Sequence, residues 1–359
     1  MKDYSLIVKL TNKCNQCCSY CYHMNDDSRN FVLSMPTDII ENTIEELLSY
    51  NTKTAEFIWH GGEPLLMGLD FFRNIVDIQH KHNKKNLRIR NSVQTNGTLL
   101  TGGYIDFFKH NEFSIGISVD GDYSLHSKLR NTTENDYDRI LHSLKLLHDS
   151  SAKYGTLSVI GKNHIGRERD FYNYIIQQNI RCLSLLPCVV IENRVINEST
   201  TISAHEYGRI LINLFDIWVN GERKGLSFSN FDDCIRFYLN KPLKSCTHLN
   251  NCDLYVTVMP DGVMYICDNF CLQDEFCIGN IKNGLHNVAS SEAIKKLNEA
   301  AVMPNDCQNC RYLHACYAGC SYHRWIISEN MKNASYYCES IKMLYDHVGL
   351  IMNKRVEML

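Results

Sequence analysis

Residues 4 to about 200 alternate between strand-like and helix-like segments, and this alternation restricts the fold class more than any other feature of the chain. The strand-like segments are short, rich in β-branched or aromatic residues, and bounded by Asn, Gly, Asp or Lys. They are 6–10, 55–60, 87–95, 113–119, 155–160 and 180–186, and amphipathic segments lie between them at 37–50, 70–80, 104–109, 137–150 and 168–178. These β-α pairs predict an α/β fold whose parallel sheet closes or nearly closes into a partial (β/α)6 TIM-like barrel.

In barrels of this kind the chemistry takes place at the carboxyl ends of the strands. The second predicted strand ends in Gly61-Gly62-Glu63-Pro64, the third in Gln94-Thr95-Asn96-Gly97 and the fourth in Ser118-Val119-Asp120-Gly121. Each end presents polar side chains beside glycine, which would suit a nucleoside or amino-acid ligand, and Glu63 could bind an amine. Asn-Gly and Asp-Gly are also ordinary turn formers, so any one loop alone is weak evidence.

The loop after the first predicted strand carries Cys14, Cys18 and Cys21 in a C-x3-C-x2-C spacing. Three thiolates on one loop can hold three irons of a four-iron, four-sulfur cube and leave the fourth iron open to another ligand. A structural zinc site needs four ligands, usually in two-plus-two spacing, and no fourth partner lies nearby in the sequence. Cys17 is not expected to be a ligand, because adjacent thiolates rarely face one metal.

Seventeen cysteines are the outlier in an otherwise ordinary composition, with 44% hydrophobic residues and a net charge of -3. The chain shows no basic patch, so neither a nucleic-acid nor a membrane partner is expected. Because it begins without a secretory segment and lacks a membrane-length apolar run, we expect a cytoplasmic protein. Disulfides are rare in that compartment, so the thiols point to metal binding.

A helix-like segment follows at 205–223, and from Cys246 onward the chain is dense in Cys, Asn, Gly and Tyr. Strand-like segments at 254–258 and 263–266 flank Pro260-Asp261-Gly262 and predict a β-hairpin. Eight of the thiols from Cys246 onward could form two complete four-ligand sites, for iron–sulfur clusters or for two structural zincs. They are Cys246, Cys252, Cys267, Cys307, Cys310, Cys316, Cys320 and Cys338. The other six thiols are taken as structural: Cys17, Cys182, Cys188, Cys234, Cys271 and Cys277.

The cysteine loop and the Gly61–Pro64 stretch together resemble the signature of radical S-adenosylmethionine enzymes. The later cysteines resemble the SPASM extension of that superfamily: Cys252-x9-Gly262-x4-Cys267, Cys307-x2-Cys310-x5-Cys316-x3-Cys320, and then Cys338. The resemblance implies a barrel at 1–200, a helical bridging segment at 201–245, a small Cys-rich SPASM domain at 246–345 and a C-terminal helix or tail at 346–359. No further N-terminal domain that could hold a leader peptide is expected.

The resemblance also assigns roles to individual residues. Cys14, Cys18 and Cys21 would hold the cluster that binds S-adenosylmethionine. Tyr20 would lie near the adenine, Gly61, Gly62, Glu63 and Pro64 near the methionine amine, Gln94, Asn96 and Ser118 along the nucleoside, and Arg130 at the carboxylate. Two auxiliary [4Fe–4S] clusters, three clusters in all, would be held by Cys246, Cys252, Cys267 and Cys320 and by Cys307, Cys310, Cys316 and Cys338.

Such enzymes cleave S-adenosylmethionine to a 5′-deoxyadenosyl radical that takes hydrogen from a substrate, here a precursor peptide or protein side chain. If the product is oxidised, an electron can leave through the auxiliary clusters, and Asp268 is a candidate base for the accompanying proton. Asp268 could equally be a turn carboxylate that accepts backbone hydrogen bonds. A flavodoxin or ferredoxin is the expected electron donor.

Two enzyme functions fit this resemblance. The first is a maturase of ribosomally made peptides of the three-residue cyclophane-forming (triceptide-like) type, which is favoured by the Trp59–Leu66 and Gln94–Leu100 stretches and by His60 in particular. Such a maturase joins an aromatic ring carbon to a β-carbon. The alternative is an anaerobic sulfatase-maturating enzyme, which oxidises Cys or Ser to formylglycine and has a Cys-Asp pair like Cys267-Asp268. A non-catalytic zinc-binding scaffold is the third alternative.

Overall fold

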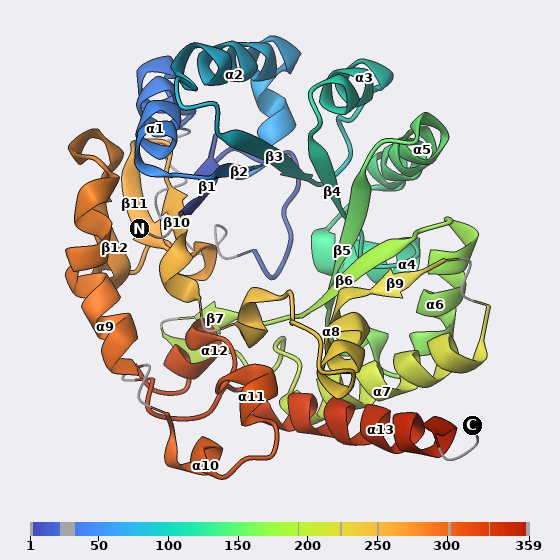
Figure 1. The fold of residues 1–359 in the computed structure, drawn as a ribbon. Coiled ribbons are helices and arrows are strands. Elements are labelled where there is room, and N and C mark those ends of the chain that lie inside the picture. Colours follow the sequence, from blue (N-terminus) through green and yellow to red (C-terminus); the bar gives the residue numbers. More distant parts are fainter. Residues whose placement is uncertain are drawn as a thin grey trace.

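The structure is a computed structural model of the 359-residue chain, and it describes residues 3–21, 33–192, 194–222, 225–249, 251–300, 303–329 and 331–356. The first two and last three residues lie outside this description, so the predicted C-terminal tail is covered only in part. Helices surround a curved sheet, and the last third of the chain lies beside the barrel (Figure 1).

Six parallel strands pair in sequence order and form the predicted barrel wall. They are β1 (Ser5–Lys9), β2 (Thr54–His60), β3 (Arg88–Thr95), β4 (Ser114–Ser118), β5 (Tyr154–Ile160) and β6 (Cys182–Pro187). In β2, Ala55, Phe57 and Trp59 are buried and alternate with half-buried residues, as expected for a strand with one face in the core. The predicted α/β partial barrel is therefore confirmed.

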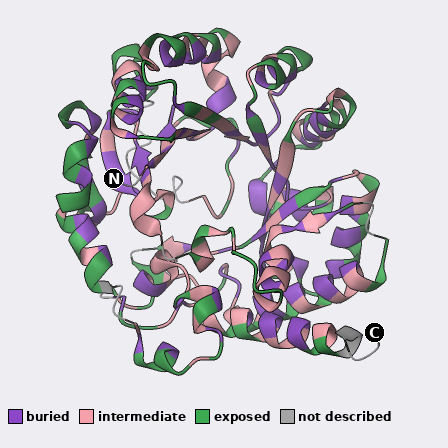
Figure 2. Cartoon of the chain, viewed as in Figure 1, coloured by how far each residue is buried: buried purple, intermediate pink, exposed green. Residues whose placement is uncertain are grey.

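The barrel helices also follow the predicted order. They are α1 (Thr37–Tyr50), α2 (Leu69–His82), α3 (Gly102–His110), α4 (Tyr123–Arg130), α5 (Glu134–Ser150) and α6 (Glu168–Gln177). In α1, the predicted apolar face of Ile40, Ile44, Leu47 and Leu48 is buried. Helices are buried on the side that faces the sheet and exposed on the outer side (Figure 2). The short helix α4, which the sequence did not predict, begins at the N-cap Asp122 and brings Arg130 back toward the barrel mouth.

The predicted hairpin is present as β10 (Tyr255–Val258) and β11 (Val263–Ile266), followed by β12 (Cys277–Asn280). Strand β10 pairs in parallel with β1, so the hairpin extends the barrel sheet instead of forming a separate one. At the other edge β9 (Ser227–Phe228) pairs with β6, and β7 (Ile191–Glu192) and β8 (Val195–Ile196) form a small separate ribbon. In this register Ile266, at the end of β11, lies level with Leu6 of β1, and the hairpin turn lies toward the carboxyl end of β1.

The remaining helices follow β6 in the sequence. They are α7 (Ala204–Asn220), α8 (Ser229–Tyr238), α9 (Glu292–Ala300), α10 (Asn305–Gln308), α11 (Leu313–Cys316), α12 (Ser321–Trp325) and α13 (Cys338–Val356). The long helix α13 runs along α7 (Figure 1). Apolar side chains of the cysteine-rich region, such as Phe270 and Ile281, belong to the same buried cluster as the barrel core. This region thus has a substantial apolar core, which the sequence analysis did not expect. None of the described helices is long and apolar enough to cross a membrane.

Candidate active site

The loop that carries the first three cysteines is held by the end of β2. Gly62 N donates to Thr11 O at 2.7 Å, and Glu63 N donates to Lys13 O at 2.9 Å. A Cβ atom on Gly62 would lie 2.1 Å from Lys13 O, a distance that no real contact allows. These glycines therefore let two backbone segments touch, whereas the sequence analysis had related them to a ligand.

The other end of the cysteine loop is held by helix α4. Ser19 N donates to Leu129 O at 2.8 Å, and Asn131 Nδ2 donates to Cys17 O at 2.7 Å. The backbone of Cys17 thus anchors the loop while its thiol is exposed. Both anchors come from elements that follow the strand ends, so the barrel itself fixes the loop.

The three predicted cluster thiols lie close enough to influence one another electrostatically. Burial raises the pKa of Cys18 to about 12, and the positive charge of Arg130 partly opposes this rise. Burial also raises the pKa of Cys14. The free Cys14 and Cys18 thiols are therefore protonated at neutral pH, and a metal cluster would have to displace those protons. Three thiols on one anchored loop fit the three-ligand set of a [4Fe–4S] cube with an open iron.

Glu63 is buried and ties β2 to β3. Its carboxylate accepts hydrogen bonds from Leu65 N at 3.0 Å, Thr95 Oγ1 at 2.7 Å and Asn96 N at 2.8 Å. Burial nevertheless raises its pKa to about 6. Since a carboxylate has about four acceptor positions, one remains for an amine donor. The amine-binding role of Glu63 stays a prediction.

The residues predicted to line a nucleoside lie on neighbouring strand ends. Asn96 Nδ2 donates to Asn15 Oδ1 at 2.8 Å and lies 3.9 Å from Cys14 Sγ, so it contacts the cysteine loop directly. Gln94 Nε2 donates to Ser118 Oγ at 3.0 Å. The structure thus brings Gln94 and Ser118 together at the ends of β3 and β4.

Arg130 forms a buried ion pair that the sequence analysis did not foresee. Its Nε donates to Asp120 Oδ2 at 2.7 Å and its Nη2 donates to Asp120 Oδ1 at 3.2 Å. Tyr20 OH donates to the same carboxylate at 3.1 Å, and the guanidinium lies over the Tyr20 ring. The proximity of Arg130 lowers the pKa of Asp120 despite its burial. Tyr20 and Arg130 are therefore adjacent, as the predicted site requires, but one edge of the guanidinium is already bound by Asp120.

A second ion pair joins the barrel to the cysteine-rich region. Lys9, the last residue of β1, lies 2.5 Å from Asp268 Oδ1, and its ammonium lies 3.3 Å from His60 Nδ1. Only 1% of the Lys9 side chain and 23% of the Asp268 side chain are exposed. Burial lowers the pKa of His60 to about 4, so its ring is neutral and accepts a hydrogen bond from Gly61 N. Sequence reasoning missed Lys9, although it is the only charge in the apolar run from Tyr4 to Leu10.

Cys267, Cys252 and Cys320 interact electrostatically, and Cys246 interacts with Cys252 and Cys320. These four thiols were predicted to form one set, and the structure brings them together. They come from the 3-10 turns at Cys246–His248 and Cys252–Leu254, from the end of β11 and from the start of α12. Cys267 has a φ of +53°, an uncommon value for a residue other than glycine, at the point where the chain turns from β11 toward Asp268.

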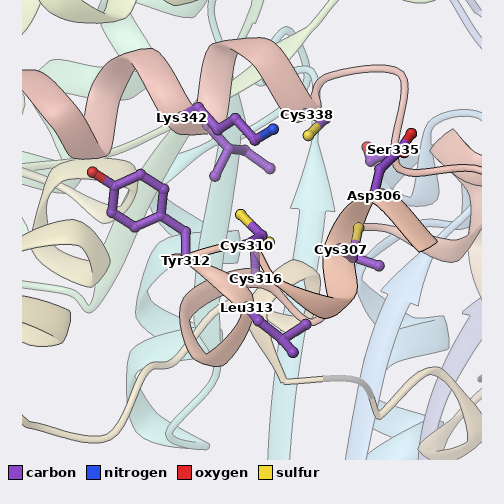
Figure 3. Close-up of a pocket in the computed structure, with 11 residues that line it drawn as sticks. Asp306, Cys307, Cys310, Tyr312, Leu313, Cys316, Ser335, Cys338 and Lys342 are labelled. Atoms are coloured by element: carbon purple, nitrogen blue, oxygen red, sulfur yellow. The ribbon is translucent and has the colours of Figure 1, made fainter. Parts of the chain in front are cut away.

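The second predicted set lines a single hollow. Cys307, Cys310, Cys316 and Cys338 surround it, together with Lys342 from α13 (Figure 3). Four thiols around one space are the donor set of a complete [4Fe–4S] cluster, so the residues fit the predicted cofactor. Among the described residues, no three His, Cys, Asp or Glu side chains converge on the position of a single metal ion.

The sequence of this chain is similar to those of known proteins. Residues 8–174 match the model of the radical SAM superfamily. The chain is 28% identical over 358 residues to the cysteine-type anaerobic sulfatase-maturating enzyme of Clostridium novyi, covering 96% of this chain and 95% of the relative. It is 24% identical over 378 residues to the serine-type enzyme of Bacteroides thetaiotaomicron, covering 98% of this chain and 90% of the relative.

Solved structures agree with these relatives. Native anSMEcpe with bound AdoMet is 26% identical and superposes with a TM-score of 0.88, covering 99% of this chain and 100% of that one. The same enzyme with bound AdoMet and a Kp18Cys peptide is 25% identical and superposes with a TM-score of 0.87 over 99% of both chains. Streptococcus suis SuiB bound to its precursor peptide SuiA, at 14% identity and a TM-score of 0.67, shares the fold.

The expectation of a cyclophane-forming maturase is wrong, because the relatives that match nearly the whole chain are sulfatase-maturating enzymes. The expectation relied largely on His60. In the structure His60 is a neutral residue at a strand end that accepts a backbone hydrogen bond, so its identity says little about the product. The Cys267-Asp268 pair, which the sequence analysis related to sulfatase-maturating enzymes, agrees better with these relatives.

Proposed function

We propose that this chain, whose residues 8–174 form a radical SAM domain, is an anaerobic sulfatase-maturating enzyme that oxidises a cysteine side chain of a peptide or protein substrate to formylglycine. The observation that carries the proposal is the superposition with anSMEcpe over 99% of this chain and 100% of that enzyme. Relatives of the cysteine type are 28% identical to this chain and those of the serine type 24% to 26%. A cysteine substrate is therefore the first choice.

The predicted cofactors, S-adenosylmethionine and [4Fe–4S] clusters, are confirmed by the family match and by the matching enzyme structures. When bound, they supply a 5′-deoxyadenosyl radical that can take a hydrogen atom from an unactivated carbon. We assign the SAM-binding cluster to Cys14, Cys18 and Cys21. We assign one auxiliary cluster to Cys246, Cys252, Cys267 and Cys320, and the other to Cys307, Cys310, Cys316 and Cys338.

The conversion of cysteine to formylglycine sets the requirements for the rest of the site. The side chain loses a hydrogen atom from Cβ, then one electron and the thiol proton, and the resulting C=S group exchanges sulfur for oxygen by reaction with water, which releases hydrogen sulfide. The site must therefore hold a base near the substrate and give the electron a way out. We assign that role to Asp268, which directly follows Cys267 and lies 2.5 Å from Lys9, the last residue of β1.

Lys9 positions this carboxylate. A buried ammonium with the Asp268 oxygen on one side and the neutral His60 ring on the other has little freedom to move. The carboxylate it binds is thereby held in a fixed orientation, which general-base catalysis requires. Electron delivery by a flavodoxin or ferredoxin remains part of the proposal, as do the boundaries at residues 200, 245 and 345.

The test is anaerobic reconstitution of the full chain with iron, sulfide and S-adenosylmethionine, followed by incubation with a reductant and a sulfatase-derived peptide that contains cysteine. We expect an aldehyde that a hydrazide reagent traps, formed together with 5′-deoxyadenosine. The same peptide with serine measures the choice between the two substrate types, and a Cys14→Ala variant is the inactive control. The absence of aldehyde from both peptides, in protein that still cleaves S-adenosylmethionine, would refute the proposal.

A further inference from the structure

One cysteine of the first auxiliary set differs from the other three in its place in the fold. Cys252 lies just before β10, Cys267 directly after β11 and Cys320 directly before α12, and all three are half-buried. Cys246 is exposed and lies in the segment that follows α8. Because Cys246 is not part of the hairpin or of α12, another part of the fold must hold it beside its three partners.

The backbone just before Cys246 is bound by one buried carboxylate. Asp233 lies on α8, and only 1% of this residue is exposed. Its Oδ1 accepts a hydrogen bond from Lys244 N at 2.9 Å, and its Oδ2 accepts one from Ser245 N at 2.8 Å. These donors belong to the two residues that precede Cys246, so Asp233 fixes the chain that carries this thiol.

The contact requires a carboxylate. Among the residues that the structure describes, Asp233 has no cation as a partner, so the two backbone N–H groups are what compensates its burial. A carboxylate presents one acceptor oxygen to each N–H group. An amide side chain would present one oxygen and would turn its own NH2 group toward the second donor.

Helix α8 is itself fixed to the barrel wall. Leu185 N, on β6, donates to Asn230 Oδ1 at 2.9 Å, and Asn230 Nδ2 donates to Leu185 O at 3.1 Å. Arg236, also on α8, donates through Nη1 to Pro242 O at 3.3 Å, which ties the helix to the same segment. The position of the segment before Cys246 is therefore set by the last strand of the barrel.

The turn that contains Cys246 is held on its other side by a histidine. His248 N donates to Ser245 O at 2.9 Å and closes the 3-10 turn Cys246–His248. Nδ1 of His248 donates to Ala315 O at 2.7 Å, on α11. The turn is thus bound to α8 before Cys246 and to α11 after it.

We propose that Asp233 is a positioning residue that holds Cys246 at the first auxiliary cluster and so closes this cluster to outside ligands. Four thiolates occupy all four irons of a cube. Without Cys246, three thiolates would remain, as in the Cys14 loop, and one iron would be open to an added thiol. The proposal rests on the assignment of Cys246 made above, and it does not depend on the product of the enzyme.

The experiment measures the protection of each thiol in the reconstituted full chain. The protein is alkylated anaerobically with N-ethylmaleimide, the clusters are removed, and the remaining thiols receive a second label that tandem mass spectrometry distinguishes. We expect all four thiols of the first auxiliary set to be protected in the wild type. In Asp233→Asn, which loses one of the two acceptors, Cys246 should be alkylated about 10-fold faster while its three partners stay protected.

Asp232→Asn is the matched control. Asp232 is the preceding residue on α8, and its carboxylate accepts from Ser227 Oγ instead of from the segment before Cys246. This variant should protect Cys246 as the wild type does. As a spectroscopic test, 2-mercaptoethanol should change the electron paramagnetic resonance spectrum of the reduced clusters in Asp233→Asn, measured with Cys14→Ala, Cys18→Ala and Cys21→Ala present, and should not change it in Asp232→Asn in the same background.

A second variant tests the contact from the other partner. Ser245→Pro removes one of the two N–H donors, and the φ of −72° at this position suits proline. It should also release Cys246, and it decides the question if thermal unfolding shows that Asp233→Asn does not fold.

Equal protection of Cys246 in the wild type and in both variants would overturn the proposal. So would loss of protection at all four thiols together, because Asp233 would then hold the whole set, or alkylation of Cys246 alone in the wild type, because it would then not be a ligand. Thiols that behave as expected in a protein that makes no aldehyde would refute the proposed function alone.

Discussion

The ammonium of Lys9 lies 2.5 Å from the carboxylate of Asp268, although the two residues are 259 positions apart in the sequence. They come within reach because β10 pairs with β1, so that β11 is only one strand away from β1 and the chain leaves β11 through the turn at Cys267. The hairpin therefore brings the candidate base Asp268, and the predicted ligand Cys267, close to the strand that precedes the cysteine loop. The cysteine-rich region thus contributes Asp268 to the candidate active site.

Replacing Lys9 by methionine should separate radical formation from product formation. The variant keeps most of the side-chain volume but removes the cation that holds Asp268, so we expect aldehyde yield to fall about 100-fold while 5′-deoxyadenosine still forms. Breaking this largely buried pair should also lower the free energy of unfolding by about 3 kcal/mol. The ratio of aldehyde to 5′-deoxyadenosine, measured by mass spectrometry and chromatography, checks the first expectation.

The matched control is Lys282→Met, which removes the cation of the Lys282–Asp38 pair on the surface. Exposed pairs contribute at most about 1 kcal/mol, so this variant should behave like the wild type in both measurements. An unchanged ratio in Lys9→Met would show that Asp268 does not depend on this cation.

Gly62→Ala should remove the first cluster selectively. The new Cβ would lie 2.1 Å from Lys13 O, so the cysteine loop must move away from β2. We expect about four fewer irons per chain after reconstitution and no cleavage of S-adenosylmethionine, with the auxiliary clusters retained. Gly102→Ala is the control, because nothing lies within 4 Å of its added Cβ. Full iron content in Gly62→Ala would contradict the packing argument.

Asp120→Asn should destabilise the protein by about 3 kcal/mol or more. It leaves the buried Arg130 guanidinium without its counter-charge and weakens the contact with Tyr20. Asp122→Asn is the comparison, since asparagine also caps helices and the pair of Asp122 with Arg167 is partly exposed. Chemical denaturation of both variants measures the free energy of unfolding. Equal losses in the two variants would show that the Asp120–Arg130 pair stabilises the fold no more than the Asp122–Arg167 pair does.

Patterns within the sequence were enough to predict the barrel and the hairpin, because strand and helix periodicity are local signals. The division of the eight later thiols into two sets of four came from the resemblance to SPASM proteins, because the members of one set are far apart in the sequence. The sequence did not predict which residues that are distant along the chain would contact each other. Asp120 and Arg130 pair because the unpredicted helix α4 turns the chain back, and Lys9 meets Asp268 because a late hairpin pairs with the first strand. The presence of His60 did not predict the substrate, because the contacts of this side chain are with Lys9 and with the backbone of Gly61.

His126 should make the protein less stable as the pH falls. It is buried beside Asp120, where its Nδ1 accepts from the Asp120 backbone N–H at 3.1 Å, and its Nε2 has no hydrogen-bond partner within the part of the chain that the structure describes. Burial lowers its pKa from 6.5 to about 4, although the Asp120 carboxylate opposes this. Between those two values the unfolded chain binds a proton that the folded chain does not, so stability is complete above pH 6.5 and is lost as the pH drops toward 4.

Between pH 7.5 and 5.5 this single group should cost about 1 kcal/mol of the free energy of unfolding. His60 and His323, whose pKa values burial also lowers to about 4, act in the same direction. His126→Gln keeps an acceptor for the Asp120 N–H but cannot titrate, so its stability should fall less steeply with pH than that of the wild type. His110→Gln, at an exposed position, should follow the wild type. Denaturant titrations at several pH values provide the slopes, and identical slopes for His126→Gln and His110→Gln would mean that His126 does take up a proton in the folded protein.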